Sequence, residues 1–268
     1  MTTTLARRRL ARDDIARAFK SRQHAWVLHY ACQGFDTSDR RITGVAARNL
    51  GDGATRSFSI DTELRRIGVD PALATPGELD RAERSLLFAF YEFVSRNLNG
   101  VFWLHWNMRN ATFGFLALEN RFRLLGGTPV EVPESQRIDL AARMIDLYGD
   151  DYAAPENRLR ALAERNRLVL RDLLDGADQA QALIHHDYAK VDRSLLVRID
   201  LIYAVAIKAN EGTLKTDAGP FDHLGGLAGV IPWLKEHPVV LACTIIAPVS
   251  GAVFGVAKLW GLLTGSGV

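Results

Sequence analysis

The alternation of hydrophobic and polar positions predicts a sheet in the first quarter of the chain. Three short stretches rich in β-branched and aromatic residues follow one another at 24–35, 41–50 and 55–60. Gly51-Asp52-Gly53 lies between the second and the third, and Asp-Gly between two strands is typical of a hairpin turn. We therefore expect three consecutive strands in an antiparallel meander.

A helix and then a buried strand are expected next. Residues 78–98 place a row of apolar side chains at helical spacing: Leu79, Ala82, Leu86, Leu87, Phe90, Phe93 and Val94. Residues 101–106 form a short, almost uninterrupted apolar run, which is typical of a strand that is buried on both faces and paired in parallel. We expect this strand beside the first one. Further helices are expected at 113–125, 136–148, 156–174 and 192–212, and a solvated basic helix near the start of the chain.

Composition and charge predict one main domain with appended segments. With 268 residues, of which 48% are hydrophobic, the chain can bury a full core. Its formal net charge of +2 is too small to identify a nucleic-acid-binding protein. The last arginine is Arg198, and the chain beyond it is richer in glycine and apolar residues. We expect a basic segment at 1–23, a main domain at 24–215, and a Gly-rich linker with an apolar tail at 216–268.

The apolar tail predicts a membrane anchor. Residues 238–257 carry no charge over twenty positions, and a helix of that length spans about 30 Å, the thickness of the hydrocarbon core of a bilayer. The main domain has one cysteine, Cys32, and no disulfide framework, so we expect it on the cytosolic side of the inner membrane. A Gly-x-x-x-Gly pair would let two tails associate as a homo-oligomer. The membrane residues expected are Pro238, Ile246, Pro248, Gly251, Gly255 and Trp260.

One part of the chain resembles a known enzyme family. The stretches ERSLLFAFYEFV and GVFWLHWNMRNATFGFLALENRFRLLGG, within residues 83–127, resemble the second conserved block of the 3′–5′ exonucleases that have four acidic metal ligands. The order of expected elements resembles the layout of that family from about residue 24 to 200. The resemblance implies an RNase H-like α/β fold, with a mixed sheet flanked by helices.

The same resemblance implies two divalent cations, Mg²⁺ or Mn²⁺, held by carboxylates. The expected positions in this chain are mostly not acidic: the first strand has Tyr30, Ala31, Cys32 and Gln33, and the second block has Asn110, Thr112 and Gly114. Only the third block, YAKVD from Tyr188 to Asp192, fits the Tyr-x-x-x-Asp pattern of the family. An active enzyme would need a displaced set of catalytic residues, drawn from Asp36, Asp139, Tyr188 and Asp192.

We therefore expect a membrane-tethered, catalytically degraded exonuclease-like protein that requires no metal or other cofactor. It would bind a nucleic acid or a protein partner through Gln33, Asn107, Arg109 and Asn110. A domain joined to a membrane segment is also a common layout of bacterial antiphage effectors, which suggests a role in defence by analogy alone. Two alternatives stay open: an active divalent-metal nuclease that uses the displaced carboxylates, and a soluble interaction protein whose apolar tail is buried.

Overall fold

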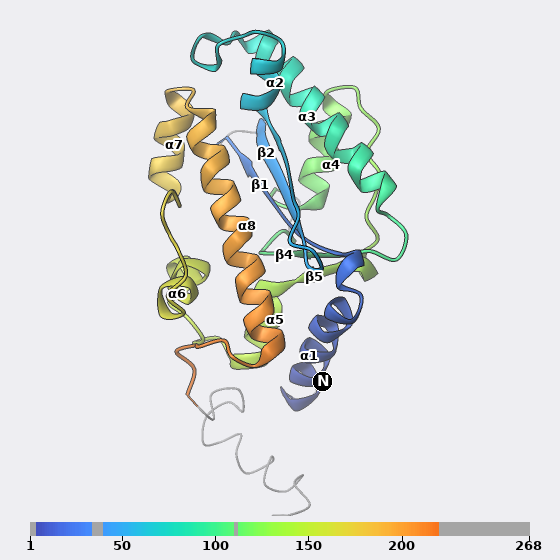
Figure 1. The fold of residues 1–268 in the computed structure, drawn as a ribbon, viewed down its shortest axis with the longest axis vertical. Helices are drawn as coiled ribbons and strands as arrows, with labels where there is room; N and C mark the ends of the chain where they lie inside the picture. Colours follow the sequence, from blue (N-terminus) through green and yellow to red (C-terminus); the bar gives the residue numbers. More distant parts are fainter. Residues whose placement is uncertain (1–3, 34–39, 110–111, 220–268) are drawn as a thin grey trace, which may run out of the picture. The chain divides into compact units, whose positions relative to one another are not determined.

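A mixed five-stranded sheet lies at the centre of this α/β protein, whose computed structural model describes residues 4–33, 40–109 and 112–219 (Figure 1). The strand order is β3-β2-β1-β4-β5. The first three strands, β1 (Ala25–Cys32), β2 (Ile42–Asn49) and β3 (Thr55–Ser59), are antiparallel neighbours. β4 (Phe102–His105) pairs in parallel with β1, and β5 (Arg137–Asp139) pairs in parallel with β4. The predicted meander and the predicted place of the buried strand beside the first strand are confirmed.

Helices cover both faces of the sheet (Figure 1). Ser57 and Phe58 are neighbours on β3, and successive side chains of a strand point to opposite faces. Ser57 hydrogen-bonds Asp192 on α8 (Tyr188–Glu211), whereas Phe58 packs against Phe90 on α3 (Pro76–Arg96). The helix predicted at 78–98 is therefore present as α3, and α8 lies along β1 and β2 on the other face.

The basic N-terminal segment is part of the same compact unit as the sheet, which extends from Met1 to Asp217. α1 (Thr4–Lys20) packs against α5 (Leu140–Tyr148) and α8. It buries Ala11, Ile15 and Ala18, which lie at helical spacing on one face. Its exposed arginines lie on the remaining surface, so the helix is solvated on one side only.

The helix predicted at 136–148 begins later, at Leu140, because residues 137–139 pair with β4 as strand β5. Asp139 ends this strand and starts the helix, since its side chain accepts a hydrogen bond from the backbone N–H of Ala141. The hydrophobic periodicity of residues 136–148 does not reveal β5, because a strand of three residues is stabilised by its neighbour β4 and not by a pattern within itself.

The long helix predicted at 156–174 is also shorter than expected. α6 (Arg158–Arg165) ends where the Asn166 side chain donates to the Leu162 carbonyl, and Arg167 and Asp172 adopt positive φ angles of 56° and 66°. A separate helix follows, α7 (Gly176–Ile184), and α8 begins four residues before the predicted start, with Asp187 as its N-cap. The remaining helices are α2 (Ile60–Arg66) and α4 (Phe115–Leu124), and short 3-10 turns occupy Arg22–His24, Pro71–Leu73, Glu134–Gln136 and Pro155–Asn157.

No helix among the described residues is long and apolar enough to cross a membrane. The predicted membrane segment at 238–257 lies outside the described residues, and so do its named members Pro238, Ile246, Pro248, Gly251 and Gly255, together with Trp260. Asp36 and Asn110, from the predicted catalytic and binding sets, also lie outside them.

Candidate functional site

A cleft opens where β4 ends beside β1. β4 ends at His105, which pairs with Leu28 on β1, so the residues that follow β4 come level with His29. The sheet extends from β1 towards β2 on one side and from β4 towards β5 on the other. In open α/β sheets the crevice at such a switch point, outside the carboxyl ends of parallel strands, is the usual place for a ligand.

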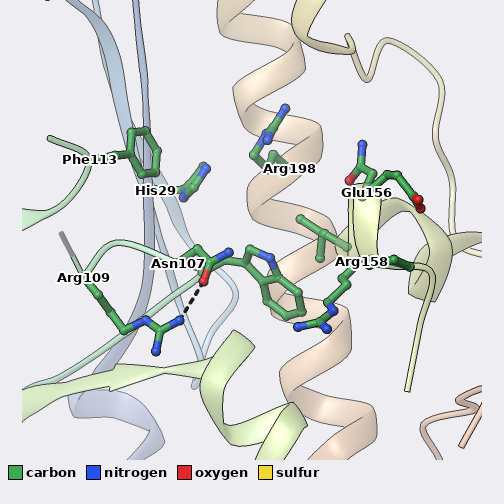
Figure 2. Close-up of a pocket in the computed structure, with 11 residues that line it drawn as sticks. His29, Asn107, Arg109, Phe113, Glu156, Arg158 and Arg198 are labelled. Carbon is green, nitrogen blue, oxygen red and sulfur yellow. Dashed lines mark hydrogen bonds between the residues drawn. The ribbon is translucent and has the colours of Figure 1, made fainter. Parts of the chain in front are cut away.

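The cleft has a volume of about 830 Å³ and is formed by four parts of the chain (Figure 2). His29 comes from β1, Arg198 comes from α8, and the segment after β4 contributes Asn107 and Arg109. The opposite wall is the turn that leads into α6, which includes Arg158. Segments that lie more than 150 residues apart in the sequence therefore meet around one cavity.

Asp139 holds the mouth of the cleft in place. Its Oδ1 atom accepts hydrogen bonds from the backbone N–H groups of Asn107 and Ala141, each at 3.1 Å. Asn107 has a positive φ of 58°, a conformation that asparagine tolerates better than most residues. Arg109 forms an ion pair with Asp139 at 2.5 Å, from Nε to Oδ2, and donates from Nη2 to the side-chain oxygen of Asn107 at 3.2 Å. Asp139 thus orients two exposed side chains that line the cleft.

Three arginines line the cleft, and they differ in how they are held. Arg109 is paired with Asp139, while Arg158 donates to the Asp150 carbonyl at 3.0 Å and lies over the Tyr152 ring at 5.2 Å. Arg198 is half-buried, and burial lowers its pKa; no carboxylate within the described ranges offsets that cost. A half-buried cation without an anionic partner is a favourable place for an anionic ligand.

His29 forms the floor of the cleft beside Arg198. It is 4% exposed, and its Nδ1 atom has no hydrogen-bond partner among the described residues. Burial, together with the nearby positive charge of Arg198, lowers the pKa of His29 well below its ordinary value of 6.5, so the ring is neutral near pH 7. The ring meets Phe113 edge-on at 5.6 Å. The Nδ1 atom is enclosed by the protein, so it is not presented to a group bound in the cleft.

The chemistry of these side chains is that of an anion-binding site. Guanidinium groups bind phosphate oxygens through paired N–H donors, and an exposed amide such as Asn107 adds further hydrogen bonds. Glu156 is the one carboxylate among the described lining residues. Across the described ranges, no group of three or more His, Cys, Asp or Glu side chains is arranged to hold a metal ion.

The structure brings together only part of the predicted site. Asn107 and Arg109 line the cleft, as a partner-binding role requires. Gln33 lies at the end of β1, where its backbone N–H donates to the Arg41 carbonyl at 2.9 Å, and it does not line the cleft.

The described members of the predicted catalytic set lie on two elements, with Asp139 on β5 and both Tyr188 and Asp192 in the first turns of α8. Asp139 is at the end of β5, whereas Asp192 accepts a hydrogen bond from Ser57 on β3 at 3.1 Å, and burial raises the pKa of Asp192. Tyr188 is buried at the start of α8, where burial raises the pKa of its hydroxyl. These three side chains share neither the cleft nor a hydrogen bond with one another.

Sequence reasoning missed His29, Phe113, Arg158 and Arg198. A signal for Arg198 was present, because it is a single arginine within the apolar run SLLVRIDLIY, where a cation is costly to bury. Arg158 belongs to an arginine-rich stretch that could follow a phosphate backbone, but the interleaved Glu164 and Asp172 favour a solvated, salt-bridged face. No signal marks His29, which reaches the cleft only through the packing of its strand.

Comparison with protein-family models, with curated protein sequences and with solved structures finds no match to this chain. The geometry and charge of the cleft alone indicate a ligand site.

Proposed function

We propose that the main domain is RNase H-like and binds single-stranded nucleic acid without cutting it. The fold part of this proposal is supported by the order of elements: an antiparallel meander, then α3, then the central strand β4 that leads into α4. This is the order that the resemblance to the 3′–5′ exonucleases implies. The sequence similarity to that family lies within residues 83–127, which form α3, β4 and α4.

The observation that carries the binding proposal is the meeting of Arg109, Arg158 and Arg198 in one cleft. Arginines that line one cleft can contact the phosphates of a strand, and the half-buried Phe113 ring provides a surface on which a base can stack. A single strand suits the cleft better than a duplex, because its bases are free to turn towards the aromatic side chain.

The absence of cleavage is proposed because Glu156 is the one carboxylate among the described lining residues, and the described aspartates of the predicted set are committed elsewhere. Two-metal hydrolysis needs carboxylates around cations that lie about 4 Å apart. Asp139 is occupied by two backbone N–H groups and by Arg109, and Asp192 faces Ser57. The competing proposal is an active nuclease with Mg²⁺ or Mn²⁺ at a set that includes Asp36, Asp139 and Asp192.

Binding and cleavage assays on the purified full chain test both proposals. We expect a fluorescent single strand to bind more tightly than a duplex of the same sequence. With three phosphates neutralised, the logarithm of the association constant should fall with the logarithm of salt concentration with a slope of about −2. We expect no cleavage with Mg²⁺ or Mn²⁺. Failure to bind either substrate would refute nucleic-acid binding, and cleavage that Asp192→Asn or Asp36→Asn abolishes would establish the nuclease instead.

We propose in addition that residues 238–257 anchor the protein in the inner membrane, with the main domain in the cytoplasm. Support comes from the charge-free length of the segment and from its flanks, since Lys208, Lys215 and Lys235 precede it and only Lys258 follows. Gly251 and Gly255 suit close packing of two such helices. An anchored nucleic-acid-binding domain would fit a defence effector by analogy of layout. A chain that stays soluble without detergent would favour the third reading, an interaction protein with a buried tail.

A further inference from the structure

A second, smaller chamber adjoins the cleft at His29 and Phe113. The chamber has a volume of about 210 Å³ and lies between β1, the start of α7 and the side of α8. Four residues line both spaces, namely His29, Phe113, Asn157 and Arg198, so the chamber borders the arginine-lined cleft. Arg198 therefore lines both spaces.

The walls of the chamber are mainly apolar, and its polar lining includes the Asp175 carboxylate, which caps α7, and the Tyr30 hydroxyl, which accepts from the Gly114 backbone N–H. Ala31 on β1, Leu183 on α7 and Leu195 on α8 provide apolar surface. The amide of Gln179 also lines the chamber, and it makes only a long 3.4 Å hydrogen bond to the Cys32 carbonyl. This amide can bond the edge of a ligand whose faces contact the apolar walls.

We propose that the inner chamber receives one base of the bound strand, while Arg198 contacts the adjoining phosphate. This inference rests on the proposed nucleic-acid binding. The chamber is smaller than the roughly 300 Å³ at which pockets for drug-sized ligands begin, so it suits a single ring system. A base has apolar faces and a hydrogen-bonding edge, which matches the walls and the Gln179 amide. Its attached phosphate matches the cation that lines both spaces.

Gly176 is an exposed position at the rim of the chamber where a larger side chain can be introduced to obstruct it without a clash. It is the first residue of α7 and lines the chamber, and a Cβ atom added there would meet no heavy atom within 4 Å. Gly77 provides a matched control, because it also lies in the first turn of a helix, α3, and a Cβ atom there also meets nothing within 4 Å. Gly77 lines neither the cleft nor the chamber.

The test compares two strands of equal length on the full chain, one with normal bases and one with abasic sugars on the same phosphate backbone. We expect the normal strand to bind about tenfold more tightly, as base stacking of roughly 1–3 kcal/mol implies. Gly176→Leu should remove this preference and leave binding of the abasic strand unchanged. Gly77→Leu should change neither value. A 2-aminopurine base in the strand should lose fluorescence on binding to the wild type and to Gly77→Leu, but not to Gly176→Leu.

The outcomes separate this inference from the function on which it rests. If both strands bind equally well to the wild type, or if Gly176→Leu keeps the full preference for bases, the chamber does not hold a base although the cleft binds phosphates. If neither strand binds the wild type, nucleic-acid binding itself is wrong and the inference falls with it. The comparison of the two strands on the wild type needs no variant. It can therefore refute the inference even if the Gly176→Leu protein does not fold.

Discussion

The Oδ1 atom of Asp139 accepts a hydrogen bond from the backbone N–H of Asn107 at 3.1 Å, across the gap between the ends of β5 and β4. The same oxygen caps α5 through Ala141. A carboxylate that the sequence offered as a candidate metal ligand therefore fixes the backbone at the mouth of the cleft. Its position between the ends of two parallel strands explains why Asn107 keeps a left-handed conformation there.

Two substitutions of Asp139 should separate the stabilisation due to its oxygen acceptor from the stabilisation due to its negative charge. Asp139→Asn keeps an oxygen acceptor for both N–H groups and loses only the pairing with the exposed Arg109, so it should cost less than about 1 kcal/mol of unfolding free energy. Asp139→Ala loses the helix cap and leaves a buried N–H without a partner, and should cost about 2 to 4 kcal/mol. Urea denaturation measures both values. Equal destabilisation by the two variants would mean that the charge, and not the acceptor, is what matters.

Removal of the Arg198 charge should weaken nucleic-acid binding without harming the fold. Arg198→Gln should reduce the affinity for a single strand roughly tenfold and make the salt slope shallower by about 0.7, because one phosphate contact is lost. The thermal melting temperature should not fall, since no carboxylate among the described residues pairs with Arg198. Arg171→Gln is the matched control: this side chain is 89% exposed and lies outside the cleft. An equal effect of both variants would point to general electrostatic attraction instead of a site.

The buried pair of Glu83 on α3 and Arg121 on α4 should be costly to break. Glu83 is fully buried and accepts from the Ile42 backbone N–H at 2.7 Å and from Nε and Nη2 of Arg121 at 2.7 and 2.5 Å. Burial raises the pKa of Glu83 even though these donors act in the opposite direction. Glu83→Leu should therefore cost about 3 to 5 kcal/mol, because it leaves the Arg121 charge without its bidentate partner. In a double-mutant cycle, Glu83→Leu/Arg121→Leu should cost clearly less than the sum of the single changes, and additive costs would contradict the coupling.

Protonation of His105 should make the protein less stable in mild acid. Burial lowers the pKa of His105 to about 4, and its Nδ1 atom accepts a hydrogen bond from the Met108 backbone N–H, which requires that nitrogen to be unprotonated. The unfolded chain takes up this proton near pH 6.5, so stability is complete above that pH and falls as the pH decreases towards 4. From pH 7 to pH 5 the loss due to this group should be roughly 2 kcal/mol. Urea denaturation of wild type and His105→Gln at both pH values measures it, and an unchanged pH dependence in the variant would refute this assignment.

The tail should partition into membranes. Each central Leu, Ile, Phe or Val of residues 238–257 favours insertion by about 0.3 to 0.6 kcal/mol, and a charge at the centre would cost about 2.5 to 3.5 kcal/mol. The full chain should pellet with membranes and resist carbonate extraction, and a chain that ends at Leu224 should remain in the supernatant. Ile246→Arg should reduce membrane retention, whereas Ile246→Leu should not. Retention of the chain that ends at Leu224 would place the membrane contact elsewhere.

Hydrophobic periodicity was sufficient to predict the centre of the fold. Turn chemistry and alternating apolar residues indicated β1, β2 and β3, and an apolar run too short for a helix indicated β4 beside β1. These signals are local, because the apolar side chains that each strand buries belong to that strand's own sequence. Periodicity failed for β5 and for the region from α6 to α7, where a partner strand and left-handed residues determine the local structure.

The cleft was only partly visible in the sequence. Asn107 and Arg109 follow a recognisable strand end, so the sequence alone marked them as candidates. His29, Arg158 and Arg198 come from three distant segments, and no local pattern relates a histidine in one strand to an arginine more than 150 residues later. The sequence determined which segments would be buried and how β1, β2, β3 and β4 would pair. Only the packing of α6 and α8 beside the ends of β1 and β4 decided which polar side chains share a cavity, because that depends on contacts between elements and not on the pattern within any one of them.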